Sequence, residues 1–153
     1  MTKLKRVLCV LLVVLAIILI ADVAVLWPQG EMIYWNNLYK SLTAEQIEEV
    51  KIEYINRSGE AVMSQEEIET LVGLLNRIHL EDAESYAYRD MTVGLKTNVF
   101  EITLKNGKSF RVEPCGNMYL VMNSNRGYLE EYEVLDAIGA FHWDLVQKYR
   151  LGK

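Results

Sequence analysis

An uninterrupted apolar segment near the N-terminus constrains this chain more than any other feature. Val7 to Trp27 is a stretch of 21 residues in which Asp22 is the only charged side chain. A helix rises about 1.5 Å per residue, so this segment reaches roughly 31 Å, close to the thickness of a bilayer's hydrocarbon core. The sequence therefore predicts a transmembrane helix over residues 7–27.

The basic residues next to this segment lie almost entirely on its N-terminal side. Lys40 is the only basic residue between Trp27 and Lys51, whereas three precede the segment: Lys3, Lys5 and Arg6. Cytoplasmic flanks of membrane helices carry an excess of lysine and arginine. We therefore expect a single-pass protein of the cell membrane, with residues 1–6 in the cytoplasm and the C-terminal domain outside.

The residues that follow predict where the helix ends. Proline lacks a backbone N–H and clashes with the preceding helical turn, so Trp27-Pro28 is expected to end the helix at the membrane surface. Residues 28–41 are then expected to form a juxtamembrane linker. Its aromatic residues would continue an interfacial belt along the outer surface: Tyr34, Trp35 and Tyr39.

A cleaved signal peptide is the alternative interpretation of the N-terminus. Such peptides share the basic start and have an apolar core of about 7–15 residues before a small-residue cleavage site. The cleavage site is poor here, because the third residue before the cut should be small. A cut after Ala24 places Asp22 at that position, and a cut after Ala21 places Leu19 there. We favour an uncleaved anchor, and the domain is exported under either interpretation.

Asp22 has two interpretations of its own. An acid at the bilayer centre costs about 2.5–3.5 kcal/mol on insertion scales, and less near the interface. Asp22 lies five residues before Trp27, so its carboxylate either lies among the lipid headgroups or contacts a polar or basic group on a partner helix. Asp22 is therefore a candidate partner contact.

The chain beyond residue 27 is acidic. It holds 13 Lys or Arg residues against 20 Asp or Glu residues, an excess that repels phosphate backbones, so we expect no nucleic-acid partner. The cysteines are Cys9 in the apolar segment and Cys115 in the domain. They would lie in different solvents, so the fold is not expected to depend on a disulfide.

Periodic apolar patterns predict an α+β domain over residues 42–153, with an antiparallel sheet of about five strands packed by two helices. Ser64 and Glu67 form a capping box at the start of the first helix, expected over residues 65–78 with one apolar face: Ile68, Leu71, Val72, Leu75 and Ile78. The second helix is expected over residues 133–149, with another apolar stripe: Val134, Leu135, Ile138, Phe141, Leu145 and Tyr149.

Residues 99–114 carry the clearest hairpin pattern. Apolar and polar residues alternate on both sides of Asn106-Gly107, which is a typical turn dipeptide. A two-residue loop would place Thr103 beside Phe110, whereas a three-residue loop with Gly107 left-handed separates one apolar face from one polar face. The second loop is therefore predicted, with three cross-strand pairs: Ile102 with Phe110, Phe100 with Val112, and Glu101 with Arg111.

The remaining elements have weaker patterns. Thr43 and Gln46 predict a capping box on a short helical turn, followed by a strand over residues 50–55. Two more strands are expected over residues 118–122 and 128–132. Residues 86–96 are either a strand pair or a long excursion.

Several short pieces of the chain resemble one known group of proteins. They are Glu66-Glu67-Ile68, Leu74-Leu75-Asn76, Ser85-Tyr86-x-Tyr88, Phe100 to Leu104 with its Asn-Gly turn, and Gly127-Tyr128. Residues 42–146 thereby resemble a small exported domain found in short signal-anchored proteins of clostridia and related Gram-positive bacteria. The resemblance implies this layout and implies no activity.

No group of residues in the sequence predicts catalysis, a cofactor or a metal site. His142 falls within the apolar stripe of the last helix and is interpreted as a hydrogen-bonded core residue, while His79 closes the first helix, where the dipole favours it. Two histidines and one domain cysteine do not make a zinc site. The glutamates around position 67 are interpreted as a solvated helix start, and Cys115 as a passive thiol at a turn.

Aromatic residues are the remaining candidates for binding. Trp143 lies about 140° from Ile138 around the last helix, off its apolar stripe, and exposed tryptophans are typical of binding hot spots. Trp143 is therefore a second candidate partner contact. The sequence predicts a non-enzymatic interaction or sensing module that meets membrane lipid and an envelope protein or wall component. A small-ligand-binding domain and a hydrolase with an unrecognised site are the alternatives.

Overall fold

The computed structural model describes residues 3–54, 59–82, 98–115, 119–122, 125–128 and 132–152. In part of these ranges only the backbone is described, at residues 3–10, 20–29, 31, 82, 98, 115, 119–122, 125–128 and 132. Their helices are α1 (Lys3–Ser41), the 3-10 turn η1 (Ala44–Gln46), α2 (Gln65–Leu75) and α3 (Tyr132–Tyr149). The strands are β1 (Ile47–Tyr54), β2 (Gly59–Val62), β3 (Glu81–Asp82), β4 (Asn98–Leu104), β5 (Ser109–Cys115), β6 (Tyr119–Met122) and β7 (Asn125–Tyr128).

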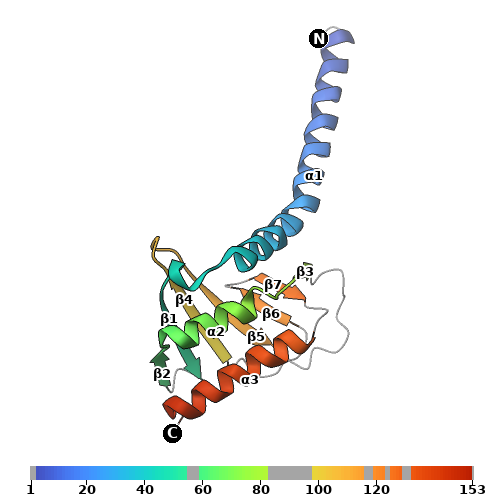
Figure 1. Ribbon diagram of the computed structural model, residues 1–153. Helices are drawn as coiled ribbons and strands as arrows, with labels where there is room; N and C mark the ends of the chain where they lie inside the picture. The colour runs from blue at the N-terminus through green and yellow to red at the C-terminus, as the bar shows by residue number, and fades with distance from the viewer. Residues whose placement is uncertain are drawn as a thin grey trace.

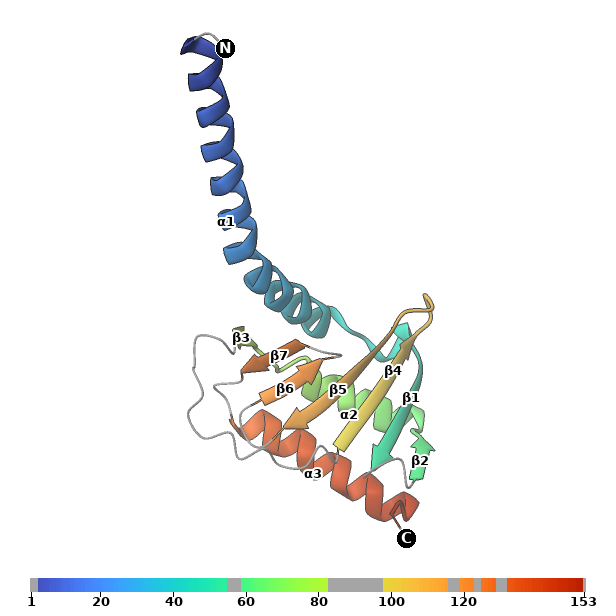
Figure 2. The same ribbon diagram turned by 180° about the vertical axis from the view of Figure 1, so that it is seen from behind.

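The domain has two layers, an antiparallel sheet and the helices that cover one of its faces. The strand order is β2-β1-β4-β5-β6-β7-β3, and α2 and α3 lie on the same side of this sheet (Figures 1 and 2). The predicted α+β class with an antiparallel sheet is confirmed. The described sheet has seven strands rather than about five, because β2 and β3 are short edge strands of four and two residues.

The hairpin of β4 and β5 has the predicted register. Phe100 pairs with Val112, Glu101 with Arg111, and Ile102 with Phe110. Gly107 is left-handed with φ 81°, and its N–H donates to the carbonyl of Leu104 at 2.9 Å. The three-residue loop is therefore confirmed, since it alone keeps the apolar residues of both strands on the helix-covered face.

Both predicted capping boxes form. Ser64 N–H donates to Glu67 Oε2 at 2.6 Å at the start of α2, and Thr43 N–H donates to Gln46 Oε1 at 3.0 Å at η1. The helix α2 ends three residues before the predicted Ile78. All five apolar residues predicted for its inner face are nevertheless buried: Ile68, Leu71, Val72, Leu75 and Ile78.

The strand predicted over residues 128–132 is observed at Tyr128 and is wrong at Tyr132, while residues 129–131 lie outside the described residues. The structure places β7 at Asn125–Tyr128, paired with β6 so that Met122 lies opposite Asn125, and α3 already begins at Tyr132. Polar residues and a glycine suggested a loop at 123–127, but backbone pairing near a sheet edge does not require apolar side chains. The ambiguous residues 86–96 lie outside the described residues.

The predicted end of the N-terminal helix at Trp27-Pro28 is also wrong. The helix α1 continues through Pro28 to Ser41, so residues 28–41 are helical rather than an irregular linker. Figure 1 shows α1 bending part way along its length. A proline inside a helix removes one hydrogen bond and clashes with the carbonyl four residues earlier, and these effects bend a helix that tertiary contacts hold together.

Those tertiary contacts come from aromatic residues expected at the membrane surface. Trp35 is 5% exposed and Tyr39 is fully buried, while Tyr34 stays 54% exposed. The ring of Phe110 on β5 lies 5.6 Å from that of Trp35 and 6.4 Å from that of Tyr39. The expected aromatic belt is therefore wrong for Trp35 and Tyr39, because the domain core offers them more apolar contact.

A polar contact fixes the same end of α1 to the start of β3. The side-chain amide of Asn36 donates from Nδ2 to Leu80 O at 2.9 Å and accepts from Leu80 N at 2.7 Å. The end of α1 thus forms part of the domain, beside α2 and β3 (Figure 1). Within the described part of the chain, no helix combines the length and the apolar character needed to cross a membrane.

Candidate partner-binding surface

Helix α3 has one face in the core and one in solvent. The inner face is nearly completely buried, at Val134, Leu135, Ile138, His142, Leu145 and Val146. The opposite face carries five exposed residues at spacings of three and four, which we name the outer stripe: Glu133, Asp136, Ala140, Trp143 and Gln147. This spacing aligns them along one side of the helix.

Trp143 is the largest side chain of the outer stripe. It is 50% exposed, and its ring lies 6.0 Å from that of Tyr54 at an interplanar angle of 63°. Tyr54 in turn lies against the C-terminal turn, where a Cβ added to Gly152 would come within 2.8 Å of the Tyr54 ring. The Trp143 ring is therefore held by an edge-to-face contact while much of its surface stays open to solvent.

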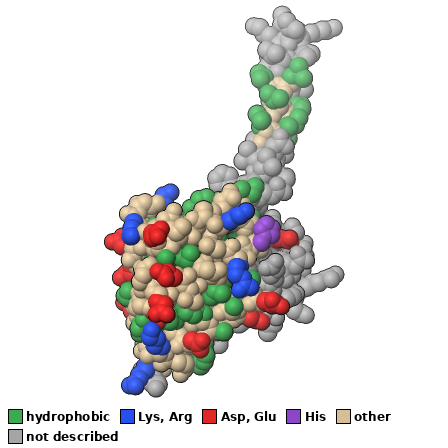
Figure 3. Space-filling view, viewed as in Figure 1, with side chains coloured by type: hydrophobic (Ala, Val, Ile, Leu, Met, Phe, Trp, Pro, Cys, Tyr) green, Lys and Arg blue, Asp and Glu red, His purple; other side chains and the backbone are tan. Residues whose placement is uncertain are grey.

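Two small residues precede Trp143 on α3. Gly139 and Ala140 lie one turn before it, and a Cβ added to Gly139 would meet nothing within 4 Å. In a helix, long side chains lean toward the preceding turn. We name the surface formed by Trp143 and these two small residues the ledge; the exposed Asp136 and Asp144 lie next to it on the helix. Figure 3 shows acidic and basic side chains interspersed with apolar ones over this side of the domain.

His142 lies on the opposite side of the same helix turn and is a core residue, as predicted. It is fully buried, and its Nε2 donates to the carbonyl of Glu53 at 3.1 Å. The ring also meets Phe100 edge-on at 5.1 Å. Burial lowers the pKa of His142 below 6.5, and the hydrogen bond to Glu53 opposes this effect. His142 therefore positions α3 on β1.

Glu67 was interpreted from the sequence as part of a solvated helix start, and this interpretation is wrong. It is only 7% exposed rather than solvated. Its carboxylate accepts hydrogen bonds from Lys148 Nζ at 2.6 Å and from Tyr149 Oη at 2.7 Å, in addition to the Ser64 N–H. Burial opposes ionisation, but the hydrogen bonds from Lys148, Ser64 and Tyr149 outweigh it and lower the pKa of Glu67 from 4.5 to about 2.

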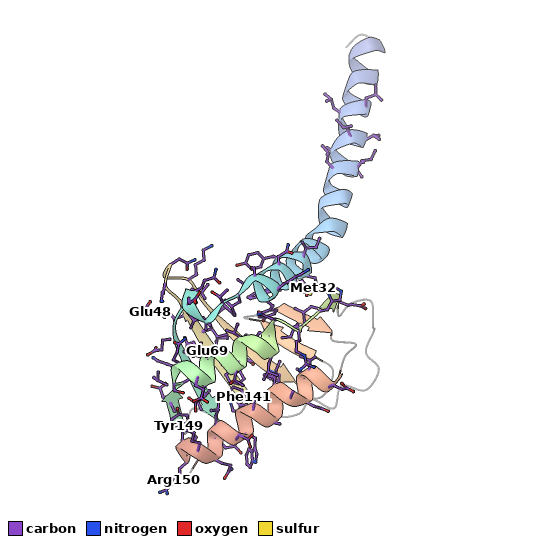
Figure 4. All side chains as sticks on the ribbon, viewed as in Figure 1. Met32, Glu48, Glu69, Phe141, Tyr149 and Arg150 are labelled. Atoms are coloured by element: carbon purple, nitrogen blue, oxygen red, sulfur yellow. The ribbon has the colours of Figure 1, made fainter. Side chains whose placement is uncertain are left out.

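This cluster fixes the C-terminal end of α3 against the start of α2. Figure 4 shows Tyr149 and Arg150 at the end of α3. No local signal could have revealed the contact, because the capping box of Glu67 is complete without Lys148. Its consequence for the surface is that the last turn of the outer stripe has a fixed position.

The other face of the sheet carries a second charged cluster. Arg111 Nη2 lies 2.8 Å from Glu53 Oε2, and Arg111 Nε lies 4.0 Å from Glu113 Oε1. The backbone pairing of Arg111 with Glu101 is as predicted, but the guanidinium group reaches past it to Glu53 on β1. These ion pairs neutralise part of the acidic charge of this face.

The remaining candidates from the sequence do not join the ledge. His79 is exposed in the segment between α2 and β3, four residues after the end of the helix. Cys115 is the last residue of β5, and Asp22 lies within α1; their side chains are outside the described set. The described residues contain no group of three His, Cys, Asp or Glu side chains placed to hold a metal ion.

Comparisons with protein-family models, with curated proteins and with solved structures find no match to this chain. The resemblance to the exported domain of signal-anchored clostridial proteins therefore stays a prediction. The candidate surface rests on the geometry of α3 alone.

Proposed function

We propose that this protein is a membrane-tethered interaction or sensing module, with its domain outside the cell and no catalytic activity. The observation that carries the proposal is the continuity of α1, which joins the apolar N-terminal segment to the core of the domain as one helix. Asp22 and Trp143 are its candidate partner contacts.

The apolar side chains of α1 support the membrane tether. The large ones between Leu11 and Leu19 are between 47% and 60% exposed on the isolated chain, and they stand out around the helix in Figure 3. Exposed apolar surface costs roughly 25 cal/mol per Å² in water. A lipid bilayer removes this cost for all sides of the helix at once, whereas a protein groove would cover one side.

The join between α1 and the domain supports a sensing role. Trp35 and Tyr39 pack on Phe110, and Asn36 holds the backbone of Leu80. No irregular linker separates the apolar segment from these contacts. A change in the tilt of α1 would thus act directly on the core and on β3, which a flexible linker would prevent.

The composition and the ledge support a protein or wall partner. The acidic charge of the domain disfavours nucleic acid. Trp143 combines a large apolar surface with a polar N–H, which is typical of residues that dominate binding energy. An envelope protein or a wall component is the partner class that meets a domain outside the membrane.

Membrane fractionation tests the tether. The full chain is expected in the membrane pellet after alkaline carbonate extraction, and protease added to intact cells is expected to remove the domain. The double variant Leu15→Arg and Ile18→Arg adds about 2.5–3.5 kcal/mol of insertion cost per residue and is expected to release the chain. Ile33→Arg is the matched control, since Ile33 is 61% exposed on the same helix but outside the apolar segment. A full-length wild-type chain in the cytosolic fraction would refute the proposal.

A further inference from the structure

We infer that the side of the domain from which the N-terminal part of α1 leaves is a docking surface for anionic lipid headgroups. This inference rests on the proposed membrane tether and goes beyond it, because it gives the folded domain a second, peripheral contact with lipid. It is carried by exposed apolar side chains on the end of α1 and by the exposed cations around them.

The C-terminal part of α1 has an outer face opposite the face that packs on the domain. Met32, Trp35 and Tyr39 are buried against the domain. Ile33 and Tyr34 point away from it and are 61% and 54% exposed. The Tyr34 ring is held by an edge-to-face contact with Trp35, with 5.4 Å between the ring centroids. A tyrosine beside an aliphatic residue suits the boundary between headgroups and acyl chains, because its ring is apolar and its hydroxyl is polar.

The distance along α1 brings this outer face to the headgroup layer. Ile33 lies six residues after Trp27, which is about 9 Å along a straight helix, and the headgroup layer is roughly 5–8 Å thick on each side of a bilayer. The bend of α1 shortens the separation further. In both views the end of α1 lies on the side of the domain from which its N-terminal part leaves (Figures 1 and 2). With residues 7–27 in the bilayer, the outer face of α1 therefore meets headgroups.

Exposed cations without a countercharge gather around this face. They come from α1, from the segment after α2 and from the turn between β4 and β5: Lys40, Arg77, Lys105 and Lys108. None of them forms an ion pair with the described residues, whereas most cations elsewhere in the domain are bound by carboxylates: Lys51, Arg111 and Lys148. Arg150, at the opposite end of the domain, is the exception (Figure 4). The free positive charge of an acidic domain thus faces the membrane.

The turn between β4 and β5 is fixed beside the end of α1. Lys105 N–H donates to the carbonyl of Gln46 in η1 at 2.9 Å, and Lys108 N–H donates to Asn106 Oδ1 at 3.0 Å. Figures 1 and 2 both show this turn on the same side of the domain as the end of α1. Its two lysines are therefore presented to the same surface as Lys40.

Arg77 is placed by its neighbour in the sequence. The side-chain amide of Asn76 donates to the carbonyls of Tyr39 and Leu42 at the end of α1, so the end of α2 that carries Arg77 lies against α1.

Two exposed acids, Glu45 and Glu48, border the surface on η1 and at the start of β1. They weaken the attraction to anionic lipid without cancelling it, because the cations outnumber them.

Lysine acylation of the full chain in vesicles tests the inference. The chain is reconstituted in neutral phosphatidylcholine vesicles and in vesicles that also contain phosphatidylglycerol, and a water-soluble acylating reagent is added. We expect Lys40, Lys105 and Lys108 to react at least about fivefold more slowly in the anionic vesicles, since one lysine near an anionic surface contributes about this factor. Lys51 and Lys148 lie outside the surface and should react alike in both. Salt at about 1 M should abolish the difference, because it shortens the Debye length to about 3 Å.

Charge variants identify the residues. Lys105→Gln with Lys108→Gln is expected to return Lys40 close to its rate in neutral vesicles, because two of the attracting charges are lost. Lys51→Gln is the matched control, since it removes one charge from a lysine that is paired with Glu49 on β1, and it should leave the protection unchanged.

The apolar contact is tested by Ile33→Ala with Tyr34→Ala, which keeps the charge of the surface and should also reduce the protection. Lysines that all react alike in the two lipids, while the chain stays in the vesicles after carbonate extraction, would overturn this inference and leave the tether standing. Loss of the chain from both kinds of vesicle on extraction would refute the tether and this inference together. Protection in neutral vesicles on addition of soluble polyphosphate would assign the cations to a soluble polyanion and would also overturn the inference.

Discussion

The Nζ of Lys148 lies 2.6 Å from the carboxylate of Glu67, across 81 residues of sequence. This ion pair joins the first turn of α2 to the last turn of α3 and is reinforced by the hydroxyl of Tyr149. Replacing the charge by Glu67→Gln keeps the side chain's shape but weakens every hydrogen bond that it accepts. We expect the free energy of unfolding to fall by about 1–2 kcal/mol. The loss is no larger because Lys148 is exposed and solvent screens its charge. Denaturant unfolding at pH 7 measures this loss, and Glu69→Gln, an exposed neighbour, is the control.

The same carboxylate predicts how stability depends on acid. The pKa of Glu67 is about 2 in the folded domain, against an ordinary 4.5, so the unfolded chain binds the proton at a higher pH than the folded one. Its contribution is fully present above pH 4.5 and is lost as the pH falls toward 2. Unfolding curves recorded across this range should show a shallower acid loss for Glu67→Gln, and parallel curves for the two proteins would contradict the assignment.

His142 predicts a second loss of stability at milder pH. Burial lowers its pKa below the ordinary 6.5, so the unfolded chain takes up a proton that the folded domain resists. The contribution of neutral His142 is present above pH 6.5 and declines as the pH falls below it. Thermal unfolding of wild type should lose stability from pH 7 downward, and His142→Gln should remove that slope. NMR titration of the His142 ring gives a direct check.

Removing the hydroxyl of Tyr39 is expected not to destabilise the folded domain. Its side chain is fully buried, and its hydroxyl has no hydrogen-bond partner among the described residues. An unsatisfied buried hydroxyl costs about 1–3 kcal/mol, so Tyr39→Phe is expected to leave stability unchanged or raise it by up to about 1 kcal/mol. A loss larger than 1 kcal/mol in denaturant unfolding would show that the hydroxyl has a partner.

Trp35 predicts how firmly α1 is joined to the domain. It is 5% exposed and packs on Tyr39 and Phe110, and removing a buried large aromatic side chain costs about 3–5 kcal/mol. Trp35→Ala is expected to lower stability by this amount and to expose residues 28–41 to limited proteolysis. Tyr34→Ala, at the exposed neighbouring position, should stay within about 0.5 kcal/mol of wild type.

Two glycines predict opposite effects of one substitution. Gly107 has φ 81°, and a side chain in this left-handed region costs about 1–2 kcal/mol. Gly107→Ala is therefore expected to destabilise the protein by about this amount. Gly73 lies inside α2 with open space around it, so Gly73→Ala should stabilise the protein by about 0.5–1 kcal/mol. Thermal unfolding of both variants checks the two signs, and destabilisation by Gly73→Ala would contradict the helix assignment at that position.

Features set by neighbouring residues could be predicted from the sequence. The capping boxes at Ser64 and Thr43 and the loop at Gly107 depend on hydrogen bonds within a few positions. The register of β4 and β5 follows from the alternation of apolar residues, since a shift of one residue would turn every side chain to the other face. Such constraints act before the chain is compact.

The tertiary structure decided what distant residues do. Glu67 looked like a solvated residue of a helix start because its partners lie on α3, and Trp35 looked like a membrane-surface residue because Phe110 lies on β5. The helix continues through Pro28 because the core holds its far end. The local pattern states which side chains seek burial or a charge partner, but only the folded chain brings the apolar surface and the countercharge that satisfy them.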